Sequence, residues 1–161
     1  MFDIGDKIVH PMHGAGVIDS IVEKSINGVS RHYYSMKLPA TGMLVMIPTD
    51  HCTEIGIRPI VDPDRARQIL SAFLTIEVEC VSNWNQRYRE NMLRLKSGNL
   101  MEVARVVKSL MIRDRQRGLS TGERKMLHTA RQIFISELVL TQTASLEEIE
   151  SQIDLATAGQ P

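Results

Sequence analysis

The chain has 161 residues, of which 43% are hydrophobic and 24% charged, and its nineteen Lys/Arg balance its nineteen Asp/Glu. This composition suits one or two globular domains, no apolar run approaches the ~20 residues of a membrane-spanning helix, and Cys52 and Cys80 are too few for a disulfide scaffold. A collagen, a membrane span and a disulfide-rich secreted domain are excluded, and the N-terminus, which lacks the pattern of a signal peptide, predicts a cytoplasmic protein.

Short antiparallel strands are predicted over residues 1–60. They are expected at residues 7–10, 15–26, 32–38 and 43–47, which are rich in β-branched and aromatic residues and are separated by turn signals. Asn27-Gly28 supplies the two positive-φ positions of a type I′ hairpin turn, and Pro48 closes the fourth strand. Four or five such strands predict a small Tudor- or SH3-like antiparallel β-barrel.

From residue 61 onward the pattern changes to that of helices, near residues 63–74, 84–96, 100–117, 121–142 and 146–157. Asp62 precedes Pro63 as an N-cap, and four further starts have capping-box spacing: Asn83…Gln86, Asn99…Glu102, Ser120…Glu123 and Ser145…Glu148. In each pair the first side chain can accept the third helical N–H, and the Gln or Glu can reach back. A compact all-α domain of about five helices is therefore expected over residues 61–161, which makes the protein α+β with two domains.

The zero net charge hides a strong segregation of charge. Residues 84–131 carry twelve Lys/Arg against four Asp/Glu, whereas residues 132–161 carry no Lys/Arg and five Asp/Glu. A basic stretch inside an otherwise neutral chain indicates a surface that binds a polyanion, although a merely solvated basic face would look the same in the sequence.

Signals of catalysis are absent from the sequence. It contains no G-x-S-x-G, P-loop or dinucleotide-binding motif, and no pair of carboxylates stands out as an acid/base couple. His10 and His13 are three residues apart in a strand and turn, a spacing that fits no zinc knuckle, and nothing near Cys80 would activate a thiol. The sequence predicts no enzyme, no metal site and no cofactor.

The single tryptophan, Trp84, begins a helix in the most basic part of the chain. Its polar neighbours and Arg87 favour an exposed ligand contact, whereas its alignment with Tyr88 on the helix favours a core anchor; both interpretations stay open at this stage. Because no helix carries a run of base-reading side chains, we expect any DNA contact to involve backbone and shape rather than base edges.

Three segments carry a resemblance to a known family. They are residues 4–16 (IGDKIVHPMHGAG), Asn83-Trp84 with Arg87-Tyr88-Arg89, and residues 118–127 (GLSTGERKML) running into Ala130-Arg131-Gln132-Ile133 and Glu137-Leu138. Together they resemble the CarD/CdnL family of bacterial RNA polymerase-binding transcription regulators over residues 1–157. The first segment also resembles the polymerase-interacting module of the transcription-repair coupling factor.

The resemblance implies that the β domain (1–60) docks on the protrusion (β1 lobe) of the RNA polymerase β subunit by strand addition, through Lys24, Met46 and Pro48. Lys24 and Met46 stand where family members often carry arginine, which changes the docking chemistry because neither offers a planar guanidinium.

The helical domain would contact promoter DNA at the upstream edge of the melted −10 region. The resemblance implies that Trp84 is a wedge that enters the minor groove and stabilises the open complex. It also implies that the DNA backbone is contacted by Arg87, Arg89, Arg124 and Lys125. The protein would be a monomer that associates with the nucleoid through the polymerase. A stand-alone architectural DNA-binding protein and a protein-interaction adaptor with scaffold helices are the alternatives.

Overall fold

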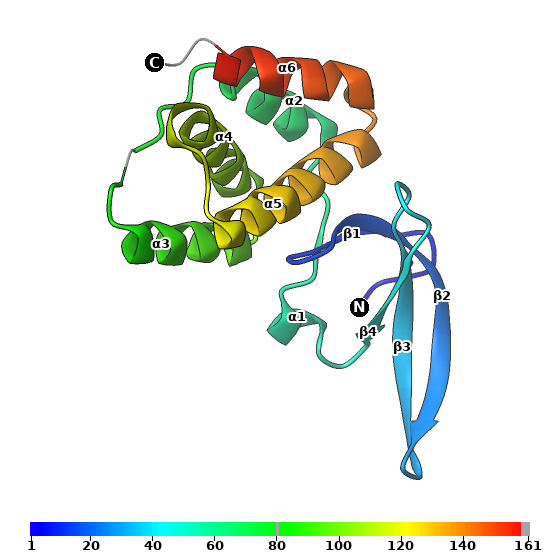
Figure 1. Ribbon diagram of the computed structural model, residues 1–161. Helices are drawn as coiled ribbons and strands as arrows, with labels where there is room; N and C mark the ends of the chain where they lie inside the picture. Colours follow the sequence, from blue (N-terminus) through cyan, green and yellow to red (C-terminus); the bar gives the residue numbers. More distant parts are fainter. Residues whose placement is uncertain (80, 159–161) are drawn as a thin grey trace.

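The computed structural model describes residues 1–79 and 81–158, and it consists of an antiparallel sheet followed by a helical domain (Figure 1). The strands are β1 (Lys7–His10), β2 (Gly14–Ile26), β3 (Val29–Lys37), β4 (Leu44–Pro48) and β5 (Arg58–Pro59). The helices are α1 (Cys52–Ile55), α2 (Pro63–Ala72), α3 (Trp84–Lys96), α4 (Leu100–Arg117), α5 (Thr121–Leu140) and α6 (Leu146–Ala158). The predicted α+β fold with five helices after the sheet is confirmed; the single-turn α1 and the short β5 are additions to the predicted elements.

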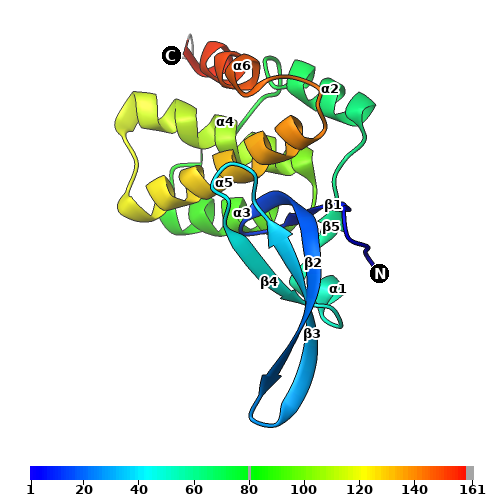
Figure 2. The same ribbon diagram turned by 90° about the vertical axis from the view of Figure 1, so that its right-hand side faces the viewer.

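The sheet has the strand order β4-β3-β2-β1-β5, all antiparallel. Asn27 (φ 54°) and Gly28 (φ 80°) form the predicted turn between β2 and β3, and both φ values are positive as a type I′ turn requires. β3 begins at Val29, three residues earlier than expected, because this tight turn lets pairing start at once with Ile26 opposite Val29. The β2–β3 hairpin projects away from the helices (Figures 1 and 2).

The helices begin where their capping residues predict. Side chains of Asp62, Asn83 and Ser120 each accept the N–H of the third helical residue, and Asn99 caps the second. The reciprocal half of the predicted capping boxes is replaced by other contacts at three starts. The Gln86 amide donates to Glu90, the Asn99 N–H donates to Ser97 Oγ, and the Glu123 carboxylate accepts from Arg87. A carboxylate gains more from a charged guanidinium than from a neutral backbone N–H, which explains the exchange at Glu123.

Two hydrophobic cores are formed, and the larger one reaches into the sheet. The smaller core lies within the sheet domain around Ile8, Ile18 and Ile47. The larger core joins the helices, where Phe73 and Phe134 stack at 5.5 Å between ring centroids, but it also includes Val9 and Ala15 of β1 and β2. The β1–β2 end of the sheet thus packs directly against the helical domain. In the part of the chain that the structure describes, no helix has the length and apolarity needed to cross a membrane.

Candidate nucleic-acid interface and docking face

Trp84 is the first residue of α3, and it is at once exposed and fixed. Its side chain is 43% exposed, its Nε1–H donates to Ser120 Oγ at 3.0 Å, and its ring stacks on Tyr88 at 5.0 Å between centroids with 18° between the planes. The indole also lies against α5, since a Cβ built on Gly122 would be 3.8 Å from Trp84 Cζ2. The structure thus combines the two interpretations of Trp84: one side packs on the protein, and the remainder faces solvent.

Arg87 occupies a different place from the one expected of a DNA contact. It is only 6% exposed, and its guanidinium donates to both oxygens of Glu123, with Nε–Oε2 2.7 Å and Nη2–Oε1 3.1 Å. It also donates to the backbone oxygens of Val81 and Ser82. Arg87 lies three residues after Trp84 on α3, and its side chain points toward α5 and not outward. The prediction that Arg87 contacts the DNA backbone therefore does not fit the structure.

Glu123 connects this ion pair to the tryptophan. Ser120 Oγ accepts the N–H of Glu123 and lies 3.4 Å from Glu123 Oε1, while it also accepts the Trp84 indole N–H. The hydrogen bond from Arg87 holds the pKa of the Glu123 carboxyl below its ordinary value, although burial acts in the opposite direction. A continuous network therefore runs from Arg87 through Glu123 and Ser120 to Trp84, and it joins the N-termini of α3 and α5.

The other three predicted DNA contacts are exposed and lie on the two helices that this network joins. Arg89 and Trp84 line the same shallow groove along α3. Arg124 and Lys125 follow Gly122, against which the rings of Trp84 and Tyr88 pack. Arg124 donates from Nε to the Leu119 carbonyl at 3.3 Å and makes a long contact of 4.0 Å to Asp114. The fold therefore brings an exposed aromatic ring and three cations to one end of the helical domain, with free helical N–H groups nearby.

The three predicted docking residues share one face of the sheet. In the strand register Pro48 of β4 lies opposite Tyr33 of β3, and Tyr33 lies opposite Val22 of β2. Lys24 on β2 and Met46 and Pro48 on β4 are therefore on the same face of the sheet, with β3 between them. β4 is an outer strand of the sheet, and Leu44 and Met46 on it are exposed.

Sequence reasoning missed Arg31 on this same face. Arg31 pairs directly with Lys24 across the β2–β3 hairpin. Like charges directly opposite each other destabilise a sheet, and among the described residues neither side chain has a salt-bridge partner. The signal was present in the sequence, because the Asn27-Gly28 turn fixes the register that places residues 24 and 31 opposite each other.

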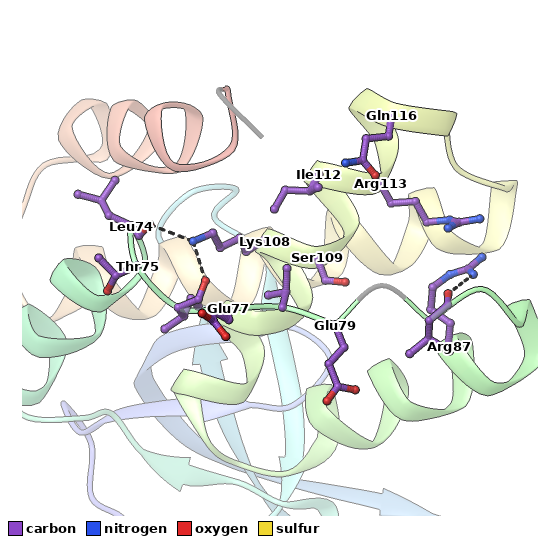
Figure 3. Close-up of a pocket in the computed structure, with 13 residues that line it drawn as sticks. Leu74, Thr75, Glu77, Glu79, Arg87, Lys108, Ser109, Ile112, Arg113 and Gln116 are labelled. Atoms are coloured by element: carbon purple, nitrogen blue, oxygen red, sulfur yellow. Dashed lines mark hydrogen bonds between the residues drawn. The ribbon is translucent and has the colours of Figure 1, made fainter. Parts of the chain in front are cut away.

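A cavity of about 430 Å³ between α4 and the segment after α2 offers no catalytic arrangement (Figure 3). Lys108, one of two buried cations that line it, the other being Arg87, donates to the backbone oxygens of Phe73, Leu74 and Ile76 at 2.8, 3.1 and 2.9 Å. Burial lowers the pKa of Lys108, but all three ammonium protons hold the backbone in place. Cys80 lies outside the described residues.

His10 and His13, which were considered as metal ligands, lie next to each other in the structure. The rings of His10 and His13 are 4.6 Å apart, and His10 Nδ1 accepts the N–H of Met12 at 3.0 Å. Over residues 1–79 and 81–158, no group of three or more His, Cys, Asp or Glu side chains is placed to hold a metal ion.

Both parts of the chain are similar to known protein families. Residues 2–61 match the CarD-like/TRCF RID domain, and residues 67–154 match the CarD C-terminal domain. The chain is also 38% identical over 151 residues to a protein of Bacillus subtilis (strain 168) named "Putative transcription factor YdeB", and the alignment covers 94% of this chain and 99% of that protein.

Proposed function

This chain belongs to the family of CarD-like transcription factors, and from that premise we propose that it binds the β subunit of RNA polymerase and stabilises the open promoter complex. In this proposal the helical domain contacts DNA at the upstream edge of the melted −10 region. The observation that carries the proposal is the geometry of Trp84, an exposed ring that is held rigidly beside Arg89, Arg124 and Lys125.

A wedge that enters a minor groove needs an apolar edge, cations close by and little freedom to move. The indole of Trp84 offers the edge, and the hydrogen bond to Ser120 with the Tyr88 stack fixes its position before DNA arrives. Prior fixation lowers the entropy that binding must remove. Partial unstacking of one base step at the fork would hinder reannealing of the melted strands.

Docking on the polymerase is supported by the exposed outer face of β4 and the hairpin. An added strand would pair with the backbone of β4 up to Pro48, and the exposed Leu44 and Met46 offer apolar contacts alongside. Lys24 and Arg31 form a doubly charged site on the same face, which suits a carboxylate of the partner. We therefore add Arg31 to the proposed docking residues Lys24, Met46 and Pro48.

The test is the lifetime of open promoter complexes with cognate RNA polymerase under heparin competition. Wild-type protein should lengthen the lifetime, and Trp84→Ala should remove most of the gain; a tenfold effect corresponds to ~1.4 kcal/mol. Leu93→Ala is the matched control, because Leu93 is 66% exposed on the same helix α3 but is not part of the network. Circular dichroism establishes that each variant is folded.

Two results would contradict the proposal. Equal lifetimes with wild-type protein and with no factor would remove open-complex stabilisation, and retained binding to polymerase would then favour an adaptor. Tight binding to free DNA with a steep salt dependence, in the absence of polymerase, would favour a stand-alone architectural protein.

A further inference from the structure

The sheet and the helical domain meet at a set of buried polar contacts on the second half of α5. Glu137 is fully buried and accepts from both terminal nitrogens of Arg58 at 2.7 and 2.6 Å, and from the backbone N–H of Val61 at 2.8 Å. Arg58 lies in β5, so this bidentate pair ties the last strand of the sheet directly to a helix of the other domain.

Further contacts hold the β1–β2 turn to the same stretch of α5. Ser136 Oγ accepts the N–H of Ala15 at 2.8 Å, and the Gln132 amide donates to His13 O at 3.2 Å. Gly14 has a φ of 92°, and a Cβ there would lie 2.6 Å from Ser136 Oγ and 3.3 Å from the α5 backbone, so a larger residue would be strained and would crowd this contact. We call Gly14, Arg58, Ser136 and Glu137 the interdomain joint.

The opposite end of α5, its N-terminus, contacts Trp84 of α3. Ser120, which accepts the indole N–H, caps the helix, and Glu137 is seventeen residues further along, or about 25 Å at 1.5 Å per residue. Arg58 also passes the end of α3, where a Cβ on Gly98 would be 3.8 Å from its Cδ. One straight helix thus connects the joint to the Trp84 network (Figure 1).

We propose that Arg58 and Glu137 are positioning residues, which fix the angle of α5 against the sheet and thereby set where Trp84 reaches the DNA once the sheet is docked. This inference rests on the proposed function. A tilt of about 10° at the joint would move the far end of α5 by about 4 Å. That displacement exceeds the rise of one base step, about 3.4 Å, so a loosened joint would take the ring away from the step it enters.

The proposal separates two quantities that the lifetime assay measures. The docking face lies on β4 and the β2–β3 hairpin, away from the joint, so the factor concentration for half-maximal effect should not change when the joint is loosened. The lifetime at saturating factor, in contrast, depends on where Trp84 lies. A variant that merely unfolds in part would need more protein but would reach the wild-type plateau.

The experiment titrates full-length Glu137→Gln and Arg58→Gln into polymerase–promoter complexes and records the lifetime under heparin. Two variants from opposite sides of the ion pair are used in case one of them does not fold. Glu102→Gln is the matched control, because it makes the same charge change at an ion pair with Arg94 within the helical domain. The emission spectrum of Trp84, the single tryptophan, reports whether its network is intact.

We expect both joint variants to retain the wild-type half-maximal concentration and the wild-type emission spectrum, but to reach about half or less of the wild-type gain in lifetime. A wild-type plateau in folded joint variants would overturn the positioning role while the proposed function stands. No gain with wild-type protein itself would overturn both.

Discussion

At the scale of single residues, Trp84 owes its place to three hydrogen-bonding side chains, those of Ser120, Glu123 and Arg87. Its indole N–H is satisfied by Ser120, Ser120 also caps α5, and Glu123 links that cap to Arg87. The buried ion pair is therefore part of the support for the proposed wedge, and the exposed cations around it would be available to phosphates. Substitution of buried Arg87 and of exposed Arg89, both on α3, should therefore have different effects.

Arg87→Ala should lower the free energy of unfolding by about 3 kcal/mol, because it leaves the Glu123 carboxylate buried without its charge partner. Arg89 is exposed and lies two residues further along α3. Arg89→Ala should leave the free energy of unfolding within about 0.5 kcal/mol of wild type and yet shorten open-complex lifetimes. Urea denaturation followed by circular dichroism measures the first quantity. An Arg87→Ala protein as stable as wild type would contradict the role given to the pair.

His10 gives the sheet a pH-dependent stability. Burial, and then the charge of His13, lower the pKa of His10 from 6.5 to about 4, so in the folded protein it stays neutral and accepts the Met12 N–H. The unfolded chain takes up a proton near pH 6.5, so the unfolded state binds more protons between pH 6.5 and about 4, and stability falls as the pH falls through this range.

His10→Asn, which keeps an acceptor for the Met12 N–H, should remove about 1 kcal/mol of this pH dependence, a value discounted for screening at a half-buried site. His32→Asn is the matched control, since His32 is exposed at the hairpin. Urea unfolding at pH 6.5 and pH 4.5 provides the measurement. Equal losses on acidification in His10→Asn and His32→Asn would refute the assignment to His10.

At the scale of elements, the position of Trp84 depends on the start of α3, which meets the start of α5 at Ser120. Asn83 caps α3 by accepting the Gln86 N–H at 2.9 Å, and Asn99 caps α4 by accepting the Met101 N–H at 2.9 Å. Asn83→Ala and Asn99→Ala should each cost about 1 kcal/mol of unfolding free energy, as measured by thermal denaturation.

Only Asn83→Ala should also change the emission of Trp84, because Asn83 precedes the tryptophan whereas Asn99 lies at the other end of α3. An unchanged emission in Asn83→Ala would mean that the network through Ser120 holds the indole without help from the start of α3.

The elements could be predicted from the sequence because their signals are local. Caps at Asp62, Asn83 and Ser120 and the Asn27-Gly28 turn act within a few residues, and the structure forms all of them. The partners of the buried carboxylates were not predictable in this way. Arg87 lies 36 residues from Glu123, and Arg58 lies 79 residues from Glu137, so both pairs are products of tertiary packing.

At the scale of the whole molecule, the distribution of charge and the rigid connection of the two domains both support the proposed contact with promoter DNA. Exposed Arg89, Arg124 and Lys125 lie in the first two turns of α3 and α5, whereas the last thirty residues, which include α6, carry only acidic charges. The sheet is joined to the helices by shared core residues and by the pair of partly buried Arg58 with fully buried Glu137. In the proposed function the protein would shift an equilibrium by its differential affinity for one state, and ~1.4 kcal/mol would be enough for a tenfold shift toward the open complex.

In the proposed function, Trp84 lies at the upstream edge of the transcription bubble when the sheet is docked on polymerase. A photoreactive benzoylphenylalanine in place of Trp84 tests this most directly, with the same group in place of Leu93 on α3 as the control. We expect crosslinks from position 84, and not from position 93, to promoter DNA at the upstream edge of the −10 region, in open complexes and only with polymerase present. Crosslinks from position 84 to protein alone, or to DNA without polymerase, would contradict the account.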